Sequence, residues 1–519
     1  MNRLAQLDCQ FVWHPFTQMR DWLKREPAVI VAGKGAVLHD IRGREYLDAN
    51  SSIWTNLHGH NHSGINAAIR QQLKKVAHSS ALGLANEPAA LLASKLVQAA
   101  NLKVGRAVPS APHVRMRKRR GEDTAPYLGK VFFSDNGSTA LEVALKLAYE
   151  FTRRTRSAGR LPASRHRIEP RFLSLEGAYH GDTVGAVSLG HIDLFHKSYS
   201  GLLFKTDRVM SPYCYRCPFN RAKPERADAR EYRKCNWECA GLVEKKFAMQ
   251  KRKGNSYAAF TFEPLIQGAA GMIPQPPGWL RRVTEIARSH GALLIADEVM
   301  TGFGRTGFSP STLNSDKSRA GSQPHPECLR GSTFLFACQH EGVQPDFLCL
   351  AKGLTGGYLP MAATLTTQKV FDAFLGEYEE FKTFFHGHSY TANQLGAAAA
   401  LASLNLLQGK PSLRARQNLE KNLHDELQTL WPLSNVGDIR QVGLIAGIEL
   451  VRDWRTRKPF DLRERAGIRV CEAMAKRGVL TRPVGNVIVL MPPYCTTPAQ
   501  AQKMVRAVFD SVREVFGKL

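Results

Sequence analysis

The feature that most constrains this sequence is an alternation of short apolar runs with amphipathic segments between about residues 85 and 370. Apolar runs of this kind are typical of strands that are buried on both faces of a sheet. The pattern predicts an α/β fold in which helices cover both faces of a mostly parallel sheet. The predicted strands lie within 129–137, 171–182, 257–265, 291–299 and 346–353.

Both ends of the chain depart from this pattern. Residues 35–50 predict a hairpin that turns near Gly43, and the C-terminal region combines long helices with short strands. We therefore predict a large domain at 61–395 and a smaller α+β domain built jointly from 1–60 and 396–519. The large domain is predicted to carry insertions at about 105–127, 153–170, 213–240 and 309–333.

The net charge of +26 raises the question of a nucleic-acid partner. Two stretches, 103–120 and 153–171, hold seven basic residues each. They coincide largely with predicted insertions and lack the interleaved aromatic side chains of a base-stacking surface, so we expect no nucleic-acid function. No apolar run reaches membrane-spanning length and no secretory signal is recognisable, so we expect a cytoplasmic protein.

Polar residues follow the ends of the predicted strands, which is where open parallel sheets bind ligands. Gly137 and Ser138 begin a predicted helix after the first strand. The free N–H groups of a helix N-terminus could bind a phosphate there, and an ordinary helix cap is the alternative. Tyr179 follows the next strand, where it could stack on a flat ring or pack in the core.

Asp297 and Lys352 follow two further strands. A carboxylate at the end of a buried strand needs a cationic partner, which could be a protonated ring nitrogen or the nearby Arg305. The lysine could extend its ammonium group to solvent. Alternatively, it could avoid the cost of burying a charge by forming a covalent imine.

Pyridoxal 5′-phosphate accounts for all four strand ends with a single ligand. It has a phosphate, a flat ring, a basic ring nitrogen and an aldehyde that bonds to a lysine. We therefore expect this cofactor, with its phosphate at Gly137 and Ser138, its ring nitrogen at Asp297 and its aldehyde carbon at Lys352.

Three stretches of the sequence resemble the class III aminotransferases: DEVMTGFGRTG (297–307), LAKGLTGGYLP (350–360) and GHSYTANQLGAAAA (387–400). The resemblance runs from about residue 11 to the end and is interrupted by the four insertions. It implies the fold of aspartate aminotransferase, known as pyridoxal-phosphate fold type I. It also implies amino-group transfer and a homodimer with shared active sites.

Further stretches are similar to one biosynthetic branch of that family, which aminates a long keto acid. Its members take the amino group from S-adenosylmethionine or from lysine, and the HPFTQM, SSIW and GHSYT forms are closer to the lysine-using type. Another class III ω-aminotransferase with a different amine and keto acid is the alternative. The stretches that carry this similarity are 13–19, 51–62, 179–190, 382–396 and 480–494.

The resemblance implies roles for residues around the cofactor. Lys352 would also move protons between the substrate and the cofactor, and Tyr179 would border both. Gly387 would contact the substrate, and His388 and Ser389 would reach the phosphate from the partner subunit.

The resemblance also implies a substrate channel lined by Phe16, Ile53 and Trp54. Arg482 would receive the substrate carboxylate, a task suited to a bidentate guanidinium. Without the resemblance, it would be an ordinary surface arginine. Many members have Tyr in place of Phe16 and a second Trp in place of Ile53, so this chain lacks a phenol and an indole on that wall.

Four cysteines fall within one predicted insertion, spaced as C-x2-C and C-x3-C: Cys214, Cys217, Cys235 and Cys239. Paired cysteines at such spacings can bind structural zinc. Reduced thiols with no metal are the alternative, since the family does not need a metal there.

Overall fold

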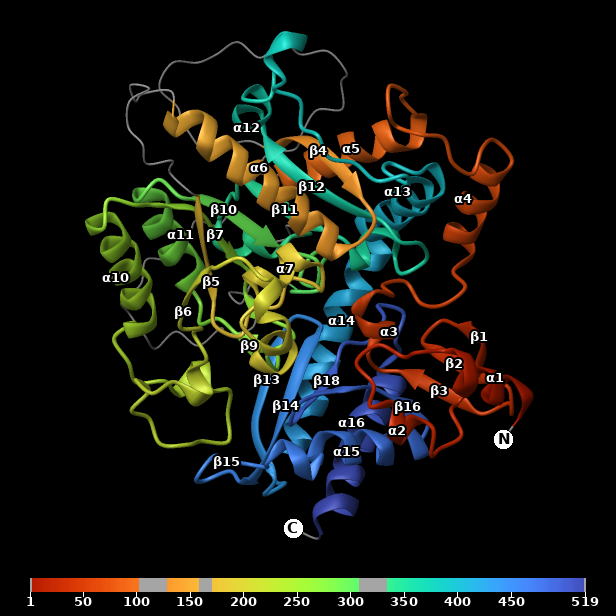
Figure 1. Cartoon of the computed structure of the whole chain (residues 1–519). Coiled ribbons are helices and arrows are strands. Elements are labelled where there is room, and N and C mark those ends of the chain that lie inside the picture. The colour runs from red at the N-terminus through yellow and green to blue at the C-terminus, as the bar shows by residue number, and fades with distance from the viewer. Residues whose placement is uncertain (1, 102–127, 158–169, 308–333, 518–519) are drawn as a thin grey trace.

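The computed structural model describes residues 2–101, 128–157, 170–307 and 334–517 (Figure 1). The predicted insertions at 105–127 and 309–333 lie outside these residues, as does most of 153–170. Residues 153–157 continue helix α6 (Gly137–Ser157) rather than starting an insertion. Within the described residues, no helix is long and apolar enough to span a bilayer.

Seven strands of the described residues form one central sheet. β10 pairs in parallel with β7 and β11, whereas β12 runs antiparallel to β4 and β11. The mostly parallel sheet is thus confirmed, although β12 and the edge strand β6 were not predicted. The spatial order is β4 (Leu128–Ser134), β12 (Ala362–Thr367), β11 (Phe347–Leu350), β10 (Leu293–Asp297), β7 (Tyr257–Phe262), β5 (Arg171–Leu175) and β6 (Asp207–Val209).

Helices cover both faces of this sheet (Figure 1). Successive side chains of a strand point to opposite faces, so Leu294 joins one hydrophobic cluster and Ile295 the other. Burial on both faces explains why these strands are continuously apolar. The helices on one face are α6, α7 (Val184–Leu189) and α12 (Gln368–Asp372), and those on the other are α5 (Glu87–Ala100), α10 (Glu238–Arg252) and α11 (Trp279–Ser289).

The N-terminal strands and the C-terminal region lie side by side (Figure 1). The predicted hairpin is present as β2 (Val37–Asp40) and β3 (Glu45–Asp48), and Gly43 in its turn has a φ of 75°. β1 (Ile30–Lys34) pairs with β2, and β16 (Val479–Leu480) pairs in parallel with β3. Leu47 packs in one cluster with Val470 and Val505, which lie on α15 (Ala466–Lys476) and α16 (Pro498–Phe516).

The C-terminal region contains a further sheet. Its strands are β13 (Val436–Val442), β14 (Ile445–Asp453), β15 (Lys458–Pro459), β17 (Pro483–Val484) and β18 (Val487–Leu490). Ala397 and Leu404 of α13 (Gln394–Gln408) pack in the core of the large sheet, whereas Leu423 of α14 (Lys410–Leu427) packs in the C-terminal cluster. The domain boundaries at 60 and 395 remain predictions.

The remaining elements are short or lie at the periphery. They are α1 (Arg3–Phe11), α2 (Met19–Trp22), α3 (Ser51–Trp54), α4 (Ser63–Leu73), α8 (Asp193–His196), α9 (Ala229–Tyr232), β8 (Ile266–Gln267) and β9 (Ile273–Pro274).

Candidate active site

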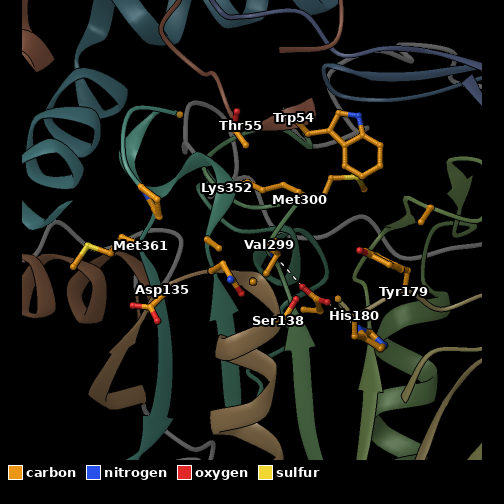
Figure 2. A pocket seen from close by; sticks show the side chains of 18 of the residues that line it. Trp54, Thr55, Asp135, Ser138, Tyr179, His180, Val299, Met300, Lys352 and Met361 are labelled. Atoms are coloured by element: carbon orange, nitrogen blue, oxygen red, sulfur yellow. Dashed lines mark hydrogen bonds and ion pairs between the residues drawn. The ribbon is translucent and has the colours of Figure 1, made fainter. Parts of the chain in front are cut away.

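A pocket of about 430 Å³ opens at the carboxyl ends of the central strands (Figure 2). This is the edge at which a parallel sheet collects the residues that follow its strands. Of the residues predicted to contact cofactor or substrate, the pocket wall includes Trp54, Gly137, Ser138, Tyr179, Asp297 and Lys352.

Asp297 is the last residue of β10 and is almost fully buried. Its Oδ2 lies 2.7 Å from Nδ1 of His180, and its Oδ1 accepts a hydrogen bond of 3.1 Å from the backbone N–H of Val299. Arg305 is not its partner, because that guanidinium donates to the carbonyl oxygens of Asn56 and Pro492. The structural arginine pair considered for Asp297 is therefore wrong, and a histidine takes that place.

Lys352 points into the same pocket (Figure 2). Burial lowers the pKa of its amine, while the nearby Asp297 and Glu263 act in the opposite direction. Its Nζ lies 4.5 Å from the centre of the Trp54 ring. Lys352 is half-buried and lines the pocket, so its amine is placed to react with a ligand there.

The N-terminus of α6 faces the pocket at Gly137 and Ser138. A Cβ added to Gly137 would lie 2.7 Å from Val299, and one added to Gly181 would lie 2.0 Å from the Ser138 hydroxyl oxygen. Only glycine fits at these two positions, because the start of α6 packs tightly against Val299 and the segment at Gly181 packs tightly against Ser138. Exposed N–H groups at a helix start are a favourable place for a phosphate.

Tyr179 also lines the pocket (Figure 2). Its hydroxyl donates a hydrogen bond of 2.6 Å to Asp182 Oδ2. Burial, together with this bond, raises the pKa of the phenol well above its ordinary value. Tyr179 therefore stays neutral and presents an apolar ring to the pocket.

Glu263 and His180 are pocket residues that the sequence interpretation missed. Glu263 directly follows β7, as Asp297 ends β10, so the same strand-end rule could have identified it. Burial raises the pKa of Glu263 to about 7. Its Oε2 accepts a hydrogen bond of 2.8 Å from the Gly268 N–H.

Trp54 is the last residue of a left-handed backbone turn. Four consecutive residues, Ser51 to Trp54, have φ values of 46°, 49°, 62° and 69°. A left-handed conformation costs an L-residue about 1–2 kcal/mol, and β-branched Ile53 is poorly suited to it. No sequence pattern predicts such a turn, although the stretch SSIW carries part of the family resemblance.

Several residues that were predicted to bind the substrate do not line the pocket. Phe16 is 63% exposed and packs against Phe195, which in turn contacts Tyr179. Ile53 is 47% exposed. Arg482 is exposed, and no hydrogen bond or ion pair joins it to another described residue.

Gly387, His388 and Ser389 lie in a loop beside the pocket. Nδ1 of His388 is 2.5 Å from Asp135 Oδ2 of the same chain, and Asp135 lines the pocket. Gly387 and Ser389 are exposed. The predicted approach of this segment to the phosphate of a partner subunit remains a prediction.

The four cysteines of the insertion at 213–240 lie within the part of the chain that the structure describes. Among the described residues, no three His, Cys, Asp or Glu side chains are arranged to hold a metal ion. Cys214 and Cys239 are buried, and burial raises the pKa of their thiols to about 12 and about 11. The zinc hypothesis for these four cysteines remains a prediction.

This insertion instead docks on the C-terminal sheet through charged groups. Arg216 donates to Glu449 through Nε at 2.8 Å, and Tyr213 also donates to Glu449. Arg440 joins Asp438 and Glu449 at 2.9 and 2.7 Å, and its Nε donates to the carbonyl oxygen of Met272. These contacts tie the insertion and the loop after β8 to the C-terminal sheet.

Comparisons with known proteins agree with this geometry. The family described as "Aminotransferase class-III" matches residues 20–314 and 330–512. The adenosylmethionine-8-amino-7-oxononanoate aminotransferase of Geobacter sulfurreducens is 44% identical over 99% of this chain and 98% of its own length. The Aquifex aeolicus protein of the same name is 42% identical over 99% and 97%.

Solved structures show the same similarity. The adenosylmethionine-8-amino-7-oxononanoate aminotransferase of Methanocaldococcus jannaschii has a TM-score of 0.79 at 36% identity and covers 99% of both chains. An amine transaminase from an uncultivated Pseudomonas species, solved in its PLP-bound form, has a TM-score of 0.78 at 30% identity, covering 97% of this chain and 99% of its own. The chain belongs to the class III aminotransferase family and is a pyridoxal-phosphate-dependent aminotransferase of fold type I.

Proposed function

We propose that this enzyme transfers an amino group to 8-amino-7-oxononanoate and so forms 7,8-diaminononanoate for biotin biosynthesis. The observation that carries the proposal is the similarity, over nearly the full length, to several relatives named for that substrate. The amino donor is S-adenosylmethionine or lysine.

The pocket residues fit pyridoxal phosphate. A glycine-lined helix start suits the phosphate, a buried carboxylate suits a protonated ring nitrogen, and a buried amine suits the aldehyde. When bound, the cofactor supplies an electron sink that stabilises negative charge on the substrate carbon.

Asp297 would keep a proton on the ring nitrogen. Its bonds with His180 and the Val299 N–H hold the carboxylate at the end of β10, so little reorganisation is needed when the charge of the ring changes. Tyr179 and the Trp54 ring would confine the substrate and exclude water.

Lys352 would serve as the acid and base of the reaction. An amine whose pKa is lowered by burial can take a proton from the substrate carbon at Nζ and return it to a neighbouring carbon. The lowered pKa brings the amine closer to neutral pH, where it can act in both directions.

We also propose a homodimer. Large apolar side chains are exposed on both sides of Gly387, namely Tyr378 (85%), Phe381 (64%), Phe385 (75%) and Tyr390 (62%). Large apolar side chains left exposed in this number are typical of an interface. Mixing a Lys352→Ala subunit with a Ser389→Ala subunit should restore activity if Ser389 serves the partner's site, because one intact site then forms. If each residue serves the site of its own chain, the mixture recovers nothing.

The substrate is tested by mass spectrometry of the reaction mixture. Purified enzyme loaded with pyridoxal phosphate is given 8-amino-7-oxononanoate with S-adenosylmethionine or with lysine. Formation of 7,8-diaminononanoate with either donor supports the proposal, and comparison of the two rates identifies the donor. No product with either donor would reject it.

The competing function is that of a class III ω-aminotransferase for another amine and keto acid. The observation in its favour is the position of Arg482, which is exposed and outside the pocket wall. A panel of amines and keto acids, run beside the first assay, separates the two functions.

A further inference from the structure

The left-handed turn Ser51–Trp54 is held by one buried carboxylate. Asp48 ends β3 and is 3% exposed. Its Oδ1 accepts hydrogen bonds from the Ser52 N–H at 2.9 Å and the Asn50 N–H at 3.3 Å. Its Oδ2 accepts from the Ser52 hydroxyl at 2.8 Å. Both oxygens thus hold the turn at its second residue.

His60 supports the same carboxylate from the other side. Its Nε2 is 3.0 Å from Asp48 Oδ2, and its Nδ1 is 3.0 Å from the Asn56 side-chain nitrogen. The Asn56 amide oxygen already accepts from the Gly59 N–H at 2.8 Å, so its NH₂ group faces the imidazole. His60 Nδ1 is therefore the acceptor, and Nε2–H donates to Asp48.

The turn places Trp54 over the reacting amine. The N–H of Trp54 donates to the Asn50 carbonyl at 2.8 Å, and the Ser51 hydroxyl donates to the Met491 carbonyl at 2.6 Å. The Trp54 ring then lies 4.5 Å from Lys352 Nζ (Figure 2). A right-handed backbone at these residues would send the indole in another direction, because the handedness of the turn sets the direction of each Cα–Cβ bond.

We propose that Asp48 is a positioning residue for the aminotransferase reaction: it offsets the backbone strain of the turn and so fixes the Trp54 wall of the substrate site. Only the expected kinetic effect of this proposal depends on the proposed function. Asp48 does not line the pocket and acts through Ser52 and Trp54.

The central test compares Asp48→Ala with Asp48→Ala combined with Ile53→Gly. Glycine adopts positive φ without strain. The Ile53 side chain is 47% exposed, so its loss empties little of the core. Asp48→Ala should raise KM for the keto acid about tenfold or more, because a charged clamp is lost, with a much smaller change in kcat. Ile53→Gly should reverse most of that rise.

Hydrogen exchange gives a readout that does not need turnover. The N–H groups of Trp54, Thr55 and Asn56 bond within the turn, so in Asp48→Ala holoenzyme they should exchange at least about tenfold faster than in the wild type. Ile53→Gly should restore protection. If Asp48→Ala does not fold, Ser52→Ala removes one of the same bonds and is measured instead.

Asp40→Asn is the matched control. Asp40 ends β2 of the same sheet, is 2% exposed, and accepts from the N–H groups of Arg42 and Arg44 at 2.9 Å each. Its turn does not border the pocket, so KM should not change. Unchanged KM and exchange in Asp48→Ala, or defects that Ile53→Gly does not reverse, would overturn the proposal. Absence of turnover in the wild type would reject the proposed function and leave the exchange test in force.

Discussion

The two sides of the pocket are built in different ways. We call Gly137, Tyr179, Asp297 and Lys352 the floor of the pocket. We call the turn Ser51–Trp54, whose Trp54 lines the pocket, the wall. The floor follows the ends of regular strands, so its side chains are placed by a repeating backbone. The wall is a strained backbone held by a buried carboxylate. We therefore expect substitutions in the floor to lower kcat and substitutions in the wall to raise KM.

The largest effect is expected for Lys352→Ala. Loss of the amine removes both the attachment of the cofactor and the acid–base group, so kcat should fall by at least about 10⁴-fold. Amino transfer measured at saturating substrates checks this. The control is Lys369→Ala, because Lys369 is an exposed lysine on α12. Its kcat should match that of the wild type. A loss of less than tenfold in Lys352→Ala would remove this residue from the chemistry.

Asp297→Asn should have the next largest effect. The amide keeps the shape of the carboxylate but cannot balance a positive ring nitrogen, so kcat should fall about 10²- to 10³-fold. The control is Asp346→Asn, because Asp346 is also buried and accepts from the Leu294 N–H at 2.8 Å, away from the pocket. That variant should lose stability but keep its kcat. Equal kcat losses in both variants would show that Asp297 acts only through folding.

Arg482→Ala tests whether a side chain outside the pocket lining takes part in binding the substrate. If Arg482 turns inward to bind the substrate carboxylate, KM for the keto acid should rise about 10- to 100-fold while the half-reaction with the amino donor is unchanged. An ester of the keto acid should show no such difference between variant and wild type. An unchanged KM would favour the competing ω-aminotransferase function.

The smallest effect is expected for Glu263→Gln, in the pH dependence of stability. Burial raises the pKa of Glu263 from 4.5 to about 7, so the folded state binds more protons than the unfolded state between these values. The free energy of unfolding contributed by this group is therefore full below pH 4.5 and is lost as pH rises toward 7. The glutamine variant should flatten that dependence by on the order of 1 kcal/mol. Urea titrations at pH 5 and pH 7.5 measure the free energy of unfolding of both proteins. An equal change in that free energy between the two pH values would contradict the prediction.

Five strands of the central sheet and the floor residues could be predicted from the sequence for a physical reason. Strands buried on both faces must be continuously apolar, so the polar residue that ends each one is conspicuous and lies at one edge of the sheet. Asp297 and Lys352 are such residues. Glu263 obeys the same rule and was overlooked because the run YAAFTFEPL was interpreted as a strand alone.

The wall could not be predicted in this way. Ser51–Trp54 has no residue that favours a positive φ. The reason for its conformation lies in hydrogen bonds to Asp48, which His60 holds in turn, and to Met491. These partners are distant in sequence or lie outside any periodic pattern. The partner of Asp297 was likewise missed, because His180 lies 117 positions from it along the chain.

The parallel pairing of β3 with β16 has a consequence for how the chain is made. β3 ends at Asp48, whereas its neighbour at Val479–Leu480 is synthesised roughly 430 residues later. At about 5–20 residues per second, a ribosome needs between roughly 20 and 90 seconds to bridge that interval. During this time the first strands leave one edge unpaired, which invites association with other nascent chains. The N-terminal strands therefore cannot complete their sheet until nearly the whole chain has been made.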